Sequence, residues 1–157
     1  SDLCDENTEF NDKLKIHLSG NIDAEALAEI EAYPKLKEKI KNLGYLSHAE
    51  VLKQYNEASL LLLLLFNSKS GVGNYPGKIF EYFAAQKPIL VFGPEGSDTQ
   101  CLISDSQTGS YFSYEEQNIK NEILNLFNVR SKLVSSDISR FSRENLAGEL
   151  SDLLNKL

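Results

Sequence analysis

Seven consecutive apolar residues, Leu60 to Phe66, constrain the fold of this 157-residue chain more than any other feature. The run is far shorter than the roughly 20 residues that cross a bilayer. Glycine and proline residues follow soon afterwards, and this punctuation together with the short length favours a strand over a buried helix. An uninterrupted apolar strand has no polar face, so the pattern predicts a central strand that is covered by helices on both sides.

Apolar runs and helical patterns alternate along the rest of the chain. The pattern predicts strands at residues 14–18, 40–45, 59–66, 88–92 and 110–113, and helices at residues 24–32, 49–56, 76–85, 98–104, 115–127 and 140–154. Because a parallel crossover needs an intervening helix, this order predicts an α/β fold: a Rossmann-like, three-layer parallel sheet with helices on both faces. Residues 1–13 are polar and acidic, so we expect a flexible lead-in there and one domain over residues 14–157.

The composition excludes some classes of partner. With 16 Lys and Arg residues against 23 Asp and Glu residues, the formal net charge is −7, which offers no basic footprint for nucleic acid. Cys4 and Cys101 have no metal-binding or redox spacing, so we interpret them as free thiols in a reducing compartment. The N-terminus has no signal-peptide pattern. We therefore expect a cytoplasmic protein, with a role at the inner membrane face left open.

The loop after the leucine run is the best candidate for chemistry, because ligands of open α/β sheets bind outside the carboxyl ends of the strands. Gly71, Gly73 and Gly77 allow a ligand to approach the backbone, and the helix that follows presents free N–H groups and its macrodipole. This combination suits a diphosphate. An ordinary loop that binds nothing remains the alternative, because glycine is common in turns and loops of every kind.

The helix after this loop adds a charge pattern. Ile79, Phe80, Phe83 and Ala84 are expected to form one apolar stripe, with Lys78, Glu81 and Tyr82 on the other face. Helical side chains lean toward the N-terminus, so Glu81 is expected to point at the loop, where its carboxylate suits the two hydroxyls of a ribose. The positive charge of Lys78 would offset the negative charge of the diphosphate. The alternative is an ordinary exposed ion pair between Lys78 and Glu81.

The segment from Asn74 to Leu90, Asn-Tyr-Pro-Gly-Lys-Ile-Phe-Glu-Tyr-Phe-Ala-Ala-Gln-Lys-Pro-Ile-Leu, resembles the donor-site signature of family 4 glycosyltransferases with the GT-B fold. The stretch from Leu43 to Val51 and the strand that ends at Gly20 are similar to earlier parts of the same domain. The resemblance covers about residues 14 to 130 in the family's order. It implies the C-terminal, donor-binding half of a retaining transferase that moves a sugar from a UDP- or GDP-sugar to a saccharide or lipid-linked acceptor.

The same resemblance implies roles for individual residues. Glu81 would bind the donor ribose, while Lys78 and the loop residues Gly73, Asn74, Tyr75 and Gly77 would contact the diphosphate and sugar. The loop at Tyr45 and Leu46 would lie near the base, and Gly20 ends the first strand. One departure is that Gly73 stands where the family often has a glutamate that touches the sugar; neighbouring Asn74 is the candidate substitute.

The resemblance also implies what this chain needs from elsewhere. The acceptor-binding N-terminal domain is expected to be a further part of the parent enzyme, so the chain alone is expected to be inactive. No catalytic residue is assigned, no metal or other cofactor is expected, and the C-terminal helix would leave an apolar stripe open to self-association. Two alternatives stay open: a sugar-nucleotide epimerase of the same architecture and a non-catalytic, flavodoxin-like signalling module.

Overall fold

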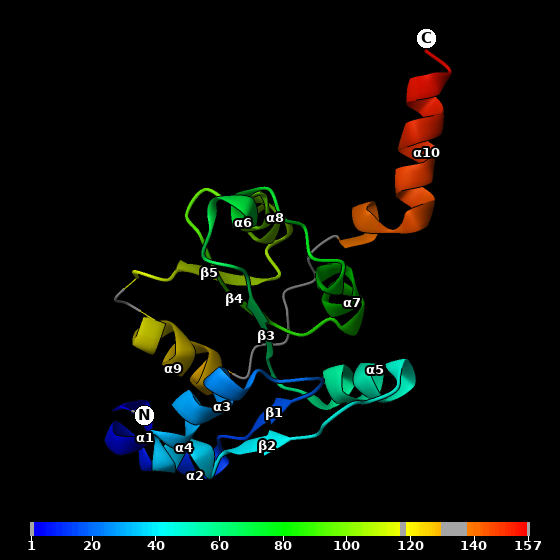
Figure 1. Ribbon diagram of the computed structural model, residues 1–157. Coiled ribbons are helices and arrows are strands. Elements are labelled where there is room, and N and C mark those ends of the chain that lie inside the picture. Colours follow the sequence, from blue (N-terminus) through cyan, green and yellow to red (C-terminus); the bar gives the residue numbers. More distant parts are fainter. Residues whose placement is uncertain (1, 117–118, 130–137, 157) are drawn as a thin grey trace. The chain divides into compact units, whose positions relative to one another are not determined.

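The computed structural model describes residues 2–116, 119–129 and 138–156 (Figure 1). Its strands are β1 (Ile16–Leu18), β2 (Ile40–Asn42), β3 (Leu61–Leu64), β4 (Ile89–Gly93) and β5 (Gly109–Ser113). Its helices are α1 (Asp2–Glu6), α2 (Thr8–Lys13), α3 (Ala24–Glu31), α4 (Pro34–Lys37), α5 (His48–Glu57), α6 (Lys69–Val72), α7 (Lys78–Ala85), α8 (Asp98–Ser106), α9 (Ile119–Val129), the 3₁₀ helix η1 (Ile138–Phe141) and α10 (Arg143–Leu154). The predicted helix at 115–127 includes residues 117 and 118, which lie outside the described residues.

The protein is an α/β protein with parallel strands, as the alternating pattern predicts. β1 pairs in parallel with β2, and β4 pairs in parallel with both β3 and β5. The strands thus form a two-stranded and a three-stranded sheet, each flanked by helices, which is consistent with a Rossmann-like fold. The contacts group into two compact units: the chain up to Gln54 together with Lys120–Asn128, and Tyr55–Ile119 together with the chain from Val129 onwards.

In the first unit, the N-terminal residues are folded. We expected no folded element before residue 14, and this expectation was wrong, because α1 and α2 bury Leu3, Cys4 and Phe10 against α9. The rings of Phe10 and Phe127 meet edge to face at 5.2 Å, and Lys120 bridges Asp2 and Glu6. Two turns of helix are too short to show periodicity on their own, so tertiary packing against α9 stabilises them.

In the second unit, the leucine run forms a strand, but β4 lies in the middle of the sheet and β3 at one side (Figure 1). The core is built on one face of this sheet. It contains Leu61, Leu63 and Leu65 from the leucine run and its end, Ile89 and Val91 from β4, Ile79, Tyr82 and Phe83 from α7, and Leu102 and Ile103 from α8. Successive strand residues point to opposite faces, so odd-numbered leucines of the run share this core.

The even-numbered leucines correct a second expectation. Leu62 and Leu64 are 43% and 63% exposed, so the leucine strand is not buried on both faces. In β4, by contrast, Ile89, Leu90 and Val91 are all buried. A run of identical apolar residues carries no alternation, and the sequence therefore could not distinguish a strand at the side of the sheet from the one in the middle.

Candidate functional site

The residues of the second unit that were predicted to bind the donor lie at the carboxyl edge of the β3-β4-β5 sheet. The loop between β3 and α7 contains the short helix α6, which the sequence analysis did not predict. In an open parallel sheet the loops at this edge are the ones that receive ligands.

The glycines of this loop have different roles. A Cβ at Gly71 would lie 2.2 Å from the backbone oxygen of Phe66, so only glycine fits where the chain turns back on the end of β3. A Cβ at Gly73 would meet nothing closer than an oxygen of Asp98 at 4.0 Å, and one at Gly77 nothing within 4 Å. Gly73 and Gly77 therefore leave the backbone uncovered, as a diphosphate site requires.

The start of α7 follows directly. Gly77 is the N-cap residue, and no side chain caps the helix. The amide of Ile79 donates to the carbonyl of Pro76 at 2.9 Å, and that of Phe80 to Gly77 at 3.2 Å. These two amides are therefore paired within the turn and are not the free N–H groups that the sequence predicted for the start of this helix. What the start of α7 offers an anion is the positive end of the helix dipole, which no side chain caps.

Glu81 lies in the first turn of α7 and is partly buried. Lys78 is exposed, and among the described residues the two side chains form no ion pair, so the ordinary surface pair is not observed. Burial and then the negative charge of Glu81 raise the pKa of Tyr55. Burial, the charge of Tyr55 and that of Glu81 also raise the pKa of Tyr82, so the carboxylate lies near both phenols.

The two faces of α7 differ from the prediction. Tyr82 is buried, its hydroxyl donates to the carbonyl of Leu62 at 3.1 Å, and its ring meets that of Tyr55 edge to face at 4.9 Å. Phe80, expected in the apolar stripe, is 41% exposed. The buried positions are Ile79, Tyr82 and Phe83, which are spaced i, i+3 and i+4. The assignment of Tyr82 to the polar face was therefore wrong, because its ring packs in the core while its hydroxyl reaches β3.

The start of the neighbouring helix α8 holds the candidate loop in place. The hydroxyl of the fully buried Thr99 donates to the carbonyl of Asn74 at 2.7 Å. Ser97 caps α8 and donates to the hydroxyl of Tyr111, which in turn donates to the carbonyl of Pro94 at 2.6 Å. Nothing in the sequence marked Thr99 and Tyr111 as supporting residues; only the cap at Ser97 had a recognisable signal, a serine before a helical pattern.

The other three candidates lie in the first unit, at the carboxyl ends of β1 and β2. The amide of Gly20 donates to the carbonyl of Gly44 at 2.8 Å, which brings Gly20 next to the loop that carries Tyr45 and Leu46. Gly20 and Gly44 have φ values of 101° and 65°, a conformation that favours glycine. Tyr45 is 88% exposed. Ser47 and Glu50 then form a capping box at the start of α5, with the Ser47 amide 2.8 Å from the carboxylate.

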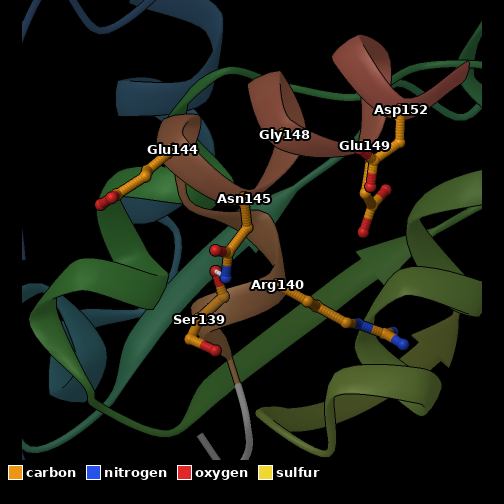
Figure 2. A pocket seen from close by; sticks show the side chains of 7 residues that line it. All are labelled: Ser139, Arg140, Glu144, Asn145, Gly148, Glu149 and Asp152. Atoms are coloured by element: carbon orange, nitrogen blue, oxygen red, sulfur yellow. Dashed lines mark hydrogen bonds between the residues drawn. The ribbon is translucent and has the colours of Figure 1, made fainter. Parts of the chain in front are cut away.

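Other features do not add a site. A shallow depression of about 360 Å³ lies between η1 and α10 and contains none of the nine candidate residues (Figure 2). Its lining includes three carboxylates, those of Glu144, Glu149 and Asp152. In the described ranges no group of three or more His, Cys, Asp or Glu side chains is arranged to hold a metal ion. None of the helices in the described part of the chain combines the length and apolarity that a bilayer span requires.

Comparisons of the chain with models of known protein families, with curated proteins and with solved structures found no match.

Proposed function

We propose that this chain is the donor-binding part of a retaining glycosyltransferase, which moves a sugar from a UDP- or GDP-sugar to a saccharide or lipid-linked acceptor in bacterial surface polysaccharide synthesis. The observation that carries the proposal is Glu81, which is partly buried, forms no ion pair with Lys78 and lies in the first turn of α7, a helix whose start no side chain caps. The resemblance of residues 74–90 to a donor-site signature supports the same assignment.

In the proposed complex each part of the donor meets a different group. The diphosphate lies over Gly77 at the start of α7, where the helix dipole and the Lys78 ammonium offset its charge. The ribose hydroxyls donate hydrogen bonds to Glu81. The sugar lies along the uncovered backbone at Gly73 and the adjoining Asn74 and Tyr75. The roles of Gly20, Tyr45 and Leu46 near the base remain predictions.

The contribution of this part to the reaction is electrostatic. During transfer, the bond between the anomeric carbon and the diphosphate oxygen breaks, a bond to the acceptor oxygen forms, and the acceptor hydroxyl loses its proton. Negative charge grows on the leaving diphosphate, and Lys78 together with the start of α7 would stabilise it more in the transition state than in the bound donor. We propose that the acceptor-binding groups come from a further domain of the parent enzyme.

The test is a thermodynamic cycle on Glu81. The affinities of UDP and GDP are compared with those of their 2′,3′-dideoxy forms, by calorimetric titration, in the wild type and in Glu81→Ala. Each charged hydrogen bond to the ribose is worth about 1.5–3 kcal/mol. The wild type should therefore prefer the ribonucleotide strongly, and the variant hardly at all.

Two controls make the result specific. Glu81→Gln keeps the shape but removes the charge, and should lose part of the preference. Glu29→Ala removes an exposed carboxylate from α3 and should leave the preference for the ribonucleotide unchanged. If wild type and Glu81→Ala prefer the ribonucleotide by the same factor, Glu81 does not bind the ribose and the proposed site is wrong.

A further inference from the structure

The helix α10 carries an uncovered row of leucines. Leu146, Leu150 and Leu153 are 45%, 56% and 60% exposed, and Leu154 beside them is 59% exposed. The first three are spaced by four and then three residues, the spacing of the d and a positions of a heptad. Ser142 caps the helix and its hydroxyl accepts from the amide of Asn145 at 3.2 Å, so a formed helix presents this row.

The leucine row and the polar residues occupy different sides of α10. Figure 2 shows the side with Asn145, Glu149 and Asp152, which faces the depression beside η1. At 100° per residue, Asn145 and Asp152 are turned about 110–130° from the centre of the row of Leu146, Leu150 and Leu153, while Glu149 lies between them and the row, at its edge. Contacts with η1 therefore do not cover the leucines.

The charges beside the row suggest what covers it. Glu149 lies in α10 and Lys156 lies just beyond its C-cap residue, Asn155. Because Asn155 keeps helical dihedral angles, φ −72° and ψ −12°, a helical continuation through it would place the two charges on the same edge of the leucine row, two turns apart. Among the described residues neither has an ion-pair partner. Ala147, a small residue, lies on the opposite edge together with Leu154.

We propose that two copies of this chain associate through α10, with the two helices antiparallel around a two-fold axis close to Ser151 and Asp152. In this register Leu150 of each copy packs against Leu153 of the other copy. Glu149 of each copy lies beside Lys156 of the other, so two ion pairs form. Leu154 of each copy packs over the small side chain of Ala147 of the other.

The antiparallel direction is the one that the charges favour. In a parallel pair, Glu149 would lie beside Leu154 of the second copy, and no ion pair would form. The antiparallel arrangement is also isologous, so it closes as a dimer. Because α10 is only about 18 Å long, the interface is small and the dimer should be weak, with dissociation in the micromolar range.

The first experiment measures association of the full chain by sedimentation velocity from about 1 to 500 μM. The wild type should dimerise as the concentration rises. Leu150→Glu should weaken self-association at least about tenfold, because the substitution places a charge in the leucine row. Ser151→Glu adds the same charge one residue away on the outer side and should leave association within about twofold of wild type. A wild type that stays monomeric, or equal effects of the two substitutions, would overturn the proposal.

The second experiment tests the register through charge exchange. Glu149→Lys and Lys156→Glu should each weaken self-association by about 2–10-fold, because like charges then face each other twice. An equimolar mixture of the two variants should associate as well as the wild type, since the mixed pair restores both opposite-charge contacts. Circular dichroism checks that α10 stays helical. If the mixture associates no better than either variant alone, the antiparallel register is wrong.

Discussion

At the scale of single residues, Gly71 shows how one missing atom shapes the candidate loop. The amide of Gly71 donates to the carbonyl of Ser68 at 2.9 Å, which turns the chain sharply after β3. The position of its absent Cβ, 2.2 Å from the Phe66 oxygen, lies against backbone, which cannot move aside as a side chain could. Gly73, two residues later, has no such contact.

We expect Gly71→Ala to lower the free energy of unfolding by about 1–3 kcal/mol, the usual cost of forcing an extra methyl group into a packed site. Gly73→Ala, with its nearest neighbour at 4.0 Å, should change stability by less than about 0.5 kcal/mol. Urea denaturation of the two variants measures the difference. Equal stabilities would contradict the described turn.

Glu50 provides a residue whose titration is linked to folding. Hydrogen bonds from the hydroxyl and then from the amide of Ser47 hold the pKa of Glu50 below its ordinary value. A carboxyl whose pKa is lower in the folded than in the unfolded state stabilises the fold above the unfolded-state pKa. That contribution is lost as the pH falls through the folded-state pKa.

Ser47→Ala should therefore have a pH-dependent effect. At neutral pH the loss of the cap should cost about 1 kcal/mol. In acid, the gap between wild type and variant should narrow, because protonated Glu50 no longer gains from accepting these bonds. Urea unfolding between pH 7 and pH 3 measures the gap. A gap that stays constant or widens in acid would show that the capping box is absent.

At the scale of secondary-structure elements, α8 supports the candidate loop without belonging to it. Thr99 is fully buried and its hydroxyl satisfies the carbonyl of Asn74, while Ser97 and Tyr111 connect the start of α8 to β5. The carbonyl of Asn74 is partly buried, so without its donor it carries part of its desolvation cost. The position of the loop thus depends on an element more than 20 residues further along the chain.

Thr99→Val keeps the volume of the side chain but removes the donor to Asn74. We expect a loss of about 1–3 kcal/mol in stability and weaker nucleotide binding, because the loop is no longer held at Asn74. Ser104→Ala, on the exposed side of the same helix, is the matched control and should have little effect. Unchanged stability in Thr99→Val would mean that this hydrogen bond does not hold the loop.

At the scale of the whole molecule, the question is whether the two compact units unfold together. The sequence predicts one domain over residues 14–157, and a single domain unfolds in one cooperative transition. Scanning calorimetry should then give equal calorimetric and van't Hoff enthalpies, of about 110 kcal/mol near 60 °C for a chain of this length. A calorimetric enthalpy about twice the van't Hoff value would show two independent units instead.

The same measurement in the presence of nucleotide tests the proposed donor site. A ligand at 100 times its dissociation constant stabilises the folded state by about 2.7 kcal/mol, which raises the Tm of a chain of this size by about 5–11 °C. UDP or GDP should produce this shift, and Glu81→Ala should reduce it. A shift of equal size in Glu81→Ala would argue against the ribose contact.

The sequence by itself determined the order and type of most elements. All five strands and the helices α3, α5, α7, α8 and α10 were predicted close to their observed bounds. These features depend on neighbouring residues, because backbone hydrogen bonds, caps and side-chain periodicity act within a few positions of the chain.

Only the tertiary structure decided which faces are buried and which strand lies in the middle. It placed β4 rather than β3 between two neighbours, buried Tyr82 rather than Phe80, and folded α1 and α2 around Phe10. It also separated Gly71, which has no room for a methyl group, from Gly73, which has. Each of these outcomes depends on contacts with residues far away in the chain, and a local sequence pattern does not identify those contacts.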